Sequence, residues 1–480
     1  MSTTRNIFIS IALALTTQLH ADIKLPSIIS DGMVLQQQSE AKLWGWSTTG
    51  SQVSVKTSWG ETSTATVQKD GQWSITVNTP EATLDDYTLT LSESGSTDTK
   101  TLKVHIGEVW LASGQSNMEM PLKGFGGACV KNGALDAMRA RQESPLVRMF
   151  NVERKQLYTP QDDCRGNWME PTFSNAMEFS ATAYYFASAL SNALGVYVGI
   201  INCSYGGSRV ESWSSEKTCS EYPDVPTDSI SIFQKTKATW ERALVTYNAM
   251  FHPIRHYTCK GIIWYQGCSN VGNNEYAYRL KRMVDQWRGE MQQGNLPFYQ
   301  VQIAPYIYGA SGDETAAARL REQQELSCNM IENSAFVCTY DLVEPNECHN
   351  IHPKEKRTVG VRLSLLALNK TYGMTDIACE GPRYDPSTFK VEGNSVTVGF
   401  KTNNMGICSN YGLEGFEIAG SDRVFHKAET QFNWRTNTVT LTAPEVNNPV
   451  AVRYCFKDFP TGNVFGGNEL PLVPFRTDDW

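Results

Sequence analysis

The stretch from Ile106 to Met120, which reads IGEVWLASGQSNMEM, joins an apolar run to an abrupt polar loop. Residues 106–112 are mostly apolar, which is typical of a strand buried on both faces of a sheet. The loop that follows contains Ser116, and a serine at the carboxyl end of a buried strand lies where open α/β sheets keep their chemistry. Ser116 is therefore a candidate catalytic residue, with a turn or helix-capping role as the alternative.

Around this stretch, residues 102–380 alternate between predicted strands and predicted helices. Repeated β-then-α units predict an α/β domain, in which a mostly parallel sheet is covered by helices on both faces. The last predicted helix carries a proline, Pro353, in its first turn. The predicted strands are 106–112, 146–151, 196–202, 261–265, 298–303 and 335–340, and the predicted helices are 180–194, 236–250, 276–291, 314–326 and 353–368.

Both flanks of this domain are rich in strand patterns. Residues 22–101 predict a small β-sandwich in which Asp70-Gly71 signals a hairpin, and residues 381–480 predict a second β-region. These flanks either brace the central domain or bind polysaccharide, and bracing is the preferred interpretation. The predicted strands are 41–46, 52–58, 62–68, 73–78 and 87–92 in the first flank, and 390–400, 416–418, 438–442 and 450–456 in the second.

The composition narrows the classes of function. The chain has 480 residues, of which 41% are hydrophobic and 19% charged, so it is an ordinary globular protein of several domains. Its formal net charge is -8 and it has no basic run, which excludes nucleic acid as a partner. No stretch approaches the ~18 apolar residues that a membrane span requires.

Residues 1–21 predict a signal peptide. Arg5 precedes a short apolar core at 7–15, and small residues lead to Ala21, so the mature chain is expected to begin near Asp22. We therefore expect an exported protein, periplasmic, on the cell surface or extracellular. Twelve cysteines in such a compartment permit disulfides, and we expect a few bridges beside buried thiols.

Three more predicted strands end in unusual loops. The strand at 196–202 leads to Ser204-Tyr205-Gly206-Gly207-Ser208, and the strand at 261–265 leads to Gln266-Gly267-Cys268-Ser269-Asn270. The last strand leads to Asp341 and then to residues 347–353, ECHNIHP. Because the carboxyl ends of parallel strands meet at one edge of a sheet, we expect these loops to gather around Ser116.

Together the loops supply the parts that acyl transfer requires. Ser116 would be the nucleophile and His352 its general base, because a hydroxyl is unreactive until a neighbour takes its proton. The backbone N–H groups of Ser116 and Gly207 and the side-chain amide of Asn270 would stabilise the oxyanion. Each residue also has a structural alternative: Gly207 could serve a turn, Asn270 could form an Asx turn, and His352 could be a hydrogen-bonded loop histidine.

Further residues flank these motifs and are candidates for binding a substrate. We assign this role to Gln115, Arg209 and Gln266. Trp213 is as well suited to pack beneath the glycine loop as to line a sugar site. Neither a metal nor another cofactor is expected.

The motifs resemble the four blocks of the SGNH hydrolases, and more closely the sialate O-acetylesterase family of carbohydrate esterases. The resemblance rests on the motifs GEVW-x-x-x-GQSNM at 107–118, GGS at 206–208, WYQG-x-SN at 264–270 and IHP with VG-x-RL at 351–363, and it extends to both ends of the mature chain. It implies an SGNH-like α/β/α hydrolase domain that removes O-acetyl groups from sugars without a cofactor. Ser116, Gly207, Asn270 and His352 carry over as nucleophile, oxyanion donors and base.

The sequence departs from the family pattern at two positions. Cys268 stands where the family has glutamate, and His349 stands where many SGNH enzymes keep an aspartate three residues before the histidine. The acid of the triad is therefore open between Asp341, Glu347 and a backbone carbonyl, with Asp341 the leading candidate.

Two functions follow from the resemblance. The first is a secreted serine esterase acting through an acyl-enzyme, on O-acetylated sialic acids or on acetylated polysaccharide such as xylan. The alternative is a non-catalytic carbohydrate-binding protein on an esterase fold, which the intact Ser116, Asn270 and His352 argue against. Neither the fold nor the catalytic triad determines which acetylated sugar is the substrate.

Overall fold

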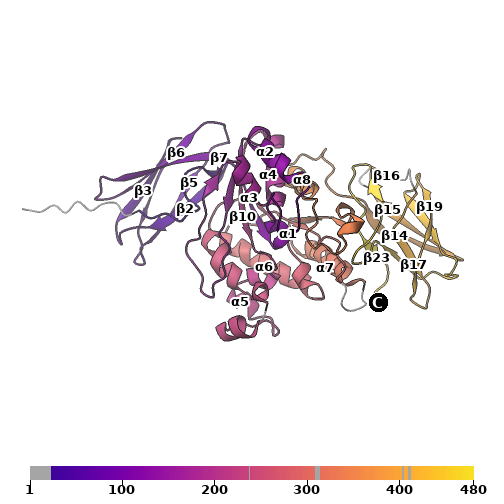
Figure 1. The fold of residues 1–480 in the computed structure, drawn as a ribbon. Coiled ribbons are helices and arrows are strands. Elements are labelled where there is room, and N and C mark those ends of the chain that lie inside the picture. The colour runs from indigo at the N-terminus through magenta and orange to yellow at the C-terminus, as the bar shows by residue number, and fades with distance from the viewer. Residues whose placement is uncertain (1–22, 237, 309–313, 403–404, 409–411) are drawn as a thin grey trace, which may run out of the picture.

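A computed structural model describes residues 23–480 except 237, 309–313, 403–404 and 409–411. The expected signal peptide lies outside the described residues. Figure 1 shows three regions in a row: an N-terminal β-region, a central α/β region, and a C-terminal β-region at the opposite end. The α/β class and the β-rich flanks predicted from the sequence are confirmed.

The long strand β7 (Thr99–Gly114) runs through the middle of the central sheet. It pairs in parallel with β10 (Tyr197–Ser204) on one side and with β11 (Gly261–Tyr265) on the other. The strands that precede β11 in the chain, β8 (Val147–Asn151) and β10, lie on one side of β7, and those from β11 onward lie on the other. The carboxyl end of β7 is therefore a topological switch point, where ligands bind in open sheets. The outer strands are β12 (Phe298–Val301), β13 (Ser334–Val337), β8 and the short antiparallel β9 (Trp168–Met169).

The apolar run of β7 is buried on both faces, as its sequence predicts. Val109 and Leu111 belong to one hydrophobic core, and Trp110 and Ala112 belong to another on the opposite face. This alternation follows from the two-residue period of a strand. Helices cover both faces: α4 (Ala181–Leu194) and α8 (Arg357–Leu366) contribute to the second core, and α6 (Tyr276–Met291) and α7 (Ala316–Met330) to the first.

Two predicted helices differ from the structure. The helix expected at 236–250 is replaced by short turns at Thr239–Glu241 and Tyr247–Phe251, because Leu244 adopts a positive φ of 55° and donates its N–H to the carbonyl of Glu211. The helix expected from Pro353 begins at Arg357, because residues 351–356 form a loop in which the Lys356 ammonium donates to the carbonyl of Pro353. Two helices were not predicted from the sequence: α2 (Gly133–Glu143) lies between β7 and β8, and α3 (Phe173–Glu178) lies between β9 and α4.

The N-terminal region contains the predicted strands in an arrangement that differs in one respect. The turn at Gly71, with φ of 81°, does not close a hairpin, because the strands before and after it pair with different partners. One pair is β2 (Glu40–Trp46) with β5 (Gln72–Asn78), and β3 (Gln52–Thr57) joins β4 (Thr62–Thr66) and β6 (Tyr87–Glu93). Strand β6 then pairs with the first half of β7, which therefore crosses the expected boundary at residues 101 and 102.

The C-terminal region forms two four-stranded sheets around its own core. The single strand expected at 390–400 is a hairpin that turns at Gly393, whose φ of 61° favours glycine. One sheet holds β14 (Arg383–Glu392), β15 (Ser395–Lys401), β20 (Thr438–Thr442) and β19 (Glu429–Asn433). The other holds β18 (Phe425–Lys427), β17 (Phe416–Ala419), β21 (Ala451–Tyr454) and β23 (Phe475–Arg476), and β16 (Ile407–Cys408) pairs with β22 (Phe465–Gly466).

The cysteines contradict one expectation. All twelve lie in the described part of the chain and all are free thiols, so the few expected disulfides are absent there. Most are buried, where a thiol packs as a small hydrophobic group. Within the described ranges, no helix combines the length and the apolar character that crossing a membrane requires.

Candidate active site

The four loops predicted to gather at the carboxyl edge of the sheet are joined by hydrogen bonds. The N–H of Tyr205 donates to the carbonyl of Gly114 at 3.0 Å, and the N–H of Gln115 donates to the carbonyl of Tyr265 at 2.9 Å. The side chain of Gln115 accepts from the N–H of Gly267 at 2.9 Å. The loops after β7, β10 and β11 therefore form one connected surface.

Ser116 begins the short helix α1 (Ser116–Glu119), and its side chain is partly exposed. Its neighbour Asn117 is fully buried and donates from Nδ2 to the carbonyl of Ile351 at 2.9 Å. The buried ammonium of Lys356 donates to Asn117 Oδ1 at 2.9 Å and to the carbonyl of Pro353 at 2.6 Å. These contacts hold the serine loop against the histidine loop.

His352 lies in this joined region, with its ring edge-on to Phe125 at 5.1 Å between centroids. Burial, and to a smaller extent the positive charge of Lys356, together lower the pKa of His352 to about 4. Burial also lowers the pKa of Lys356, to about 7. The histidine is therefore neutral at neutral pH, which is the state that accepts a proton.

This environment predicts the pH profile. If neutral His352 is the base, kcat/KM should stay high through pH 5 to 6 and fall only as pH approaches about 4, rather than near the ordinary value of 6.5. Lys356→Gln removes the neighbouring charge and should move this acid limb to higher pH. A rate profile on p-nitrophenyl acetate, corrected for unfolding by circular dichroism, measures both. An acid limb at 6.5 in the parent would contradict the assigned base.

The structure does not bring the leading triad acid to the histidine. Both carboxylate oxygens of Asp341 accept from the guanidinium of Arg362, at 2.8 and 2.6 Å, and both side chains are buried. Among the described residues, no hydrogen bond joins Asp341 or Glu347 to the ring of His352. Glu347 instead accepts from the N–H groups of Glu344 and Lys354. The orienting role predicted for Asp341 is not realised in this structure.

The Asp341–Arg362 ion pair leads to a second prediction. Asp341→Asn should act on stability, because removing one partner of a buried ion pair typically costs about 3 to 5 kcal/mol. We expect a lower thermal unfolding midpoint and a kcat within a few-fold of the parent at a temperature where both are folded. A loss of kcat on the order of 10⁴ without loss of stability would restore Asp341 as the orienting acid.

Asn270 is held in place by its neighbours. Its Oδ1 accepts from the N–H of Val210 at 3.1 Å and from Gln266 Nε2 at 2.7 Å, which fixes the orientation of the amide. Its Nδ2 donates to the carboxylate of Glu211 at 3.1 Å. Glu211 is itself buried and paired with Arg279 at 2.7 Å. A second, longer contact of 3.4 Å joins the same nitrogen to the other oxygen of Glu211, so a single carboxylate is the acceptor for Nδ2.

Gly207 is required by its surroundings. Its φ of 76° favours glycine, and a Cβ built there would lie 2.5 Å from Cγ of Trp240. No described residue accepts a hydrogen bond from its backbone N–H. Trp213 is buried beneath this loop and donates from Nε1 to Ser208 Oγ at 2.9 Å, so it packs under the glycines.

The three predicted substrate-binding residues have different surroundings. Gln266 is fully buried, and it donates to Ser208 and Asn270 and accepts from Tyr276, so the prediction that it contacts substrate is wrong. Gln115 is 2% exposed and links two loops. Arg209 is 43% exposed and pairs with Glu241 at 3.1 Å. Arg209 lines a cavity of about 620 Å³ that also includes Asn270.

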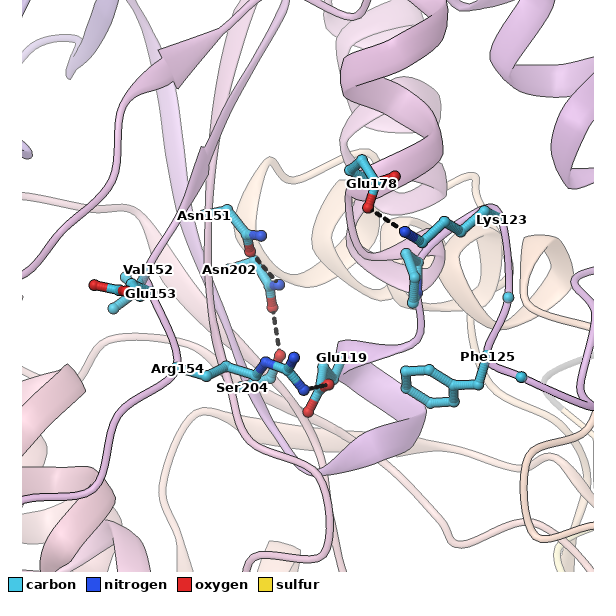
Figure 2. Close-up of a pocket in the computed structure, with 13 residues that line it drawn as sticks. Glu119, Lys123, Phe125, Asn151, Val152, Glu153, Arg154, Glu178, Asn202 and Ser204 are labelled. Atoms are coloured by element: carbon cyan, nitrogen blue, oxygen red, sulfur yellow. Dashed lines mark hydrogen bonds and ion pairs between the residues drawn. The ribbon is translucent and has the colours of Figure 1, made fainter.

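A second cavity, of about 350 Å³, is lined by residues of α1, β8 and β10 and of the segment after α1 (Figure 2). Helix α1 contributes Glu119 to the cavity wall. The Glu119 carboxylate accepts hydrogen bonds from the N–H of Gly206 and from Arg154. Glu119 belongs to the same short helix as Ser116, so the cavity opens beside α1. Its wall is formed by Glu119, Pro121, Lys123, Gly124, Phe125, Gly126, Asn151, Val152, Glu153, Arg154, Glu178, Asn202 and Ser204.

Some residues of the site were missed from the sequence. Asn117 and Lys356 lie inside motifs that were noted, but only their contacts reveal that they join the loops. Glu119 and Arg154 are 35 residues apart, and no spacing signals their pairing. Within the described residues, no group of three or more His, Cys, Asp or Glu side chains is placed to hold a metal ion.

Comparison with known proteins defines the family. The family model described as carbohydrate esterase, sialic acid-specific acetylesterase, matches residues 106–369, more than half of the chain and all four loops of the site. The chain belongs to this family. It is a carbohydrate O-acetylesterase, an enzyme that removes O-acetyl groups from sugars.

Relatives of this esterase match over most of their length. Sialate O-acetylesterase of Mus musculus is 27% identical over 417 residues, 75% of each chain, and that of Homo sapiens is 28% identical over 396 residues, 75% of this chain and 73% of the human one. A carbohydrate acetylesterase from Xanthomonas citri has a similar solved structure, with 31% identity and a TM-score of 0.84. The match covers 95% of this esterase and all of that chain.

Proposed function

We propose that this esterase hydrolyses sugar acetates through an acetyl-enzyme on Ser116, in the manner of SGNH hydrolases. One observation carries the proposal: Asn117 and Lys356 hold the loop of Ser116 against the loop of His352. The proposal is supported by the tie between the loop that carries the partly exposed Ser116 and the loop that carries a neutral His352, at the switch point of the sheet. The N–H of Gly207 and the oriented amide of Asn270 belong to the adjoining loops.

In the proposed reaction, His352 accepts the proton of the Ser116 hydroxyl as its oxygen attacks the acetyl carbonyl. The N–H groups of Ser116 and Gly207 and Nδ2 of Asn270 donate to the oxyanion. The intermediate collapses, and the sugar hydroxyl leaves with the proton held by His352. Water then attacks the acetyl-enzyme with His352 again as base, releasing acetate and restoring the serine.

No carboxylate orients the imidazole in this proposal. The Asn117–Lys356 contacts hold the backbone on both sides of His352, at Ile351 and Pro353. The ring itself packs against Phe125. We therefore propose a serine–histidine dyad positioned by a buried lysine and an asparagine, with the lysine and asparagine acting as positioning residues.

A fluorophosphonate probe tests the nucleophile, because it reacts with activated serines. Labelling should add one probe per chain, and peptide mapping should place it on Ser116. The rate of acetate release from acetylated sugars should fall in proportion to the fraction of chains labelled. Labelling of another serine, or acetate release that persists after complete labelling, would reject the proposal.

We further propose that the enzyme works after export. The proposal rests on Arg5, the apolar core at 7–15 and the small residues before Asp22. Expression with the natural amino terminus in a bacterial host should yield a processed protein beginning near Asp22. Recovery of the unprocessed chain in the cytoplasm would contradict export.

A further inference from the structure

Trp240 is an exposed aromatic side chain beside the glycine loop of the site. It lies in the short turn Thr239–Glu241 and is 49% exposed, whereas Trp213 beneath the same loop is fully buried. Among the described residues, none accepts a hydrogen bond from the indole N–H of Trp240, whereas the N–H of Trp213 donates to Ser208 Oγ. Trp240 therefore offers a ligand both an open apolar ring and an N–H donor.

The Trp240 side chain packs directly against Gly207. A Cβ built on Gly207 would lie 2.5 Å from Cγ, 2.6 Å from Cδ1 and 2.8 Å from Cβ of Trp240. Because that Cβ would be about 1.5 Å from the glycine Cα, Trp240 Cγ lies within about 4 Å of Cα of Gly207. The indole thus fills the space that a side chain at position 207 would need.

This contact places the indole near the ester that reacts. The N–H of Gly207 is a proposed oxyanion donor, so the acetyl oxygen would lie about 3 Å from its nitrogen and no more than about 9 Å from Trp240 Cγ. On the other side of the loop, a Cβ built on Gly206 would lie 3.6 Å from Cβ of Ser116. Two successive glycines therefore separate the nucleophile from the indole, and the sugar begins only two bonds beyond the acetyl carbon.

The turn that carries Trp240 is tied to the rest of the site. Arg209, which follows the glycine loop, pairs with Glu241 at 3.1 Å, and the carbonyl of Thr239 accepts from Gln156 Nε2 at 3.0 Å. Arg209 and Glu241 remain 43% and 32% exposed, so a donor and an acceptor for sugar hydroxyls lie beside the ring. The platform is held in place before a ligand binds, which lowers the cost of binding.

We propose that Trp240 binds the sugar that carries the acetyl group, with the indole face packed against the C–H face of the sugar. The C–H groups of a sugar ring carry partial positive charge and face the negative surface of the aromatic ring. Trp240 would therefore determine specificity, favouring acetates of sugars over simple alkyl acetates. This inference rests on the proposed function, since it takes Gly207 as an oxyanion donor and Ser116 as the nucleophile.

The test compares an ester that has a sugar with one that has none. The sugar ester is a mono-O-acetylated xylo-oligosaccharide, or the methyl glycoside of 9-O-acetyl-N-acetylneuraminic acid if the parent enzyme hydrolyses it faster, and the other ester is ethyl acetate. The specificity ratio is kcat/KM for the sugar ester divided by kcat/KM for ethyl acetate. Trp240→Ala should lower this ratio roughly 5- to 10-fold. The loss should appear mainly in KM, because the stacking exists before and during the reaction.

Three further variants separate stacking from bulk and from any effect of a lost tryptophan. Trp240→Phe keeps an aromatic face and should hold the ratio within about threefold of the parent, whereas Trp240→Leu should resemble Trp240→Ala. The matched control is Trp434→Ala, which should leave the ratio unchanged. Trp434 is 71% exposed in the turn after β19, which Figure 1 shows in the C-terminal region, away from α1.

A specificity ratio that Trp240→Ala leaves unchanged would overturn the inference. Equal losses for both esters would also overturn it, because Trp240 would then support the Gly207 loop rather than bind sugar. So would equal ratios in Trp240→Phe and Trp240→Leu, or an equal fall in Trp434→Ala; circular dichroism verifies that each variant is folded. Failure of the proposed function has a different signature, since hydrolysis of ethyl acetate would then survive Ser116→Ala.

Discussion

Replacing Ser116 by alanine is expected to lower kcat for acetate release on the order of 10⁶-fold, as loss of the nucleophile does in other serine hydrolases. Residual activity would come from oxyanion donors and binding alone. The change removes one oxygen from a partly exposed side chain at the start of α1, so the fold should persist. Acetate release from p-nitrophenyl acetate and from an acetylated sugar measures the effect.

The control for this variant is the nearby Ser204→Ala. Ser204 lines the cavity but is 2% exposed and donates to Asn202. It should keep reactivity toward the fluorophosphonate probe, whereas Ser116→Ala should lose it. Activity that survives Ser116→Ala and disappears in Ser204→Ala would move the nucleophile to β10.

Asn270→Ala should lower kcat by roughly 10²- to 10³-fold with little change in KM, because removing one oxyanion donor typically costs ~2.7 to 4 kcal/mol in the transition state. The structure gives this expectation its geometric basis. Val210 and Gln266 fix one end of the amide, and Glu211 accepts from Nδ2 at the other end.

Asn273→Ala provides the matched control for Asn270. Asn273 also donates to Glu211, at 3.5 Å, but it lies farther along the same loop. Its loss should alter kcat by no more than a few-fold. An Asn270 variant that changes only KM would show that the amide binds sugar, and equal losses in both variants would place the effect in the arrangement around Glu211.

The fold was largely predictable because its signals are local. The apolar run of β7 and the helical spacing of α4 and α6 depend on neighbouring residues, and those elements appear where they were predicted. The prediction of a helix at 236–250 was wrong because Leu244 adopts a positive φ and donates its N–H to the carbonyl of Glu211, far away in the sequence. A sequence pattern does not contain that contact.

The site was predictable in its parts and less so in its connections. The loops of Ser116, Gly207, Asn270 and His352 were placed at one edge by the rule for parallel strands, and their hydrogen bonds confirm the placement. The partner of Asp341 was not predictable, because Arg362 lies 21 residues away on α8. Nor was the burial of Gln266, since exposure at a strand end depends on which loops cover it.

Strand β7 has a mechanical consequence. Its first half pairs with β6 of the N-terminal region, its middle pairs in parallel with β1 (Met33–Gln36), and its last half pairs with β10 and β11. A continuous strand offers no hinge, so the N-terminal region cannot swing freely relative to the serine at the end of the same strand. Any surface of that region that contacts a polymeric substrate would therefore lie at a fixed distance and orientation relative to the acetyl group that is removed.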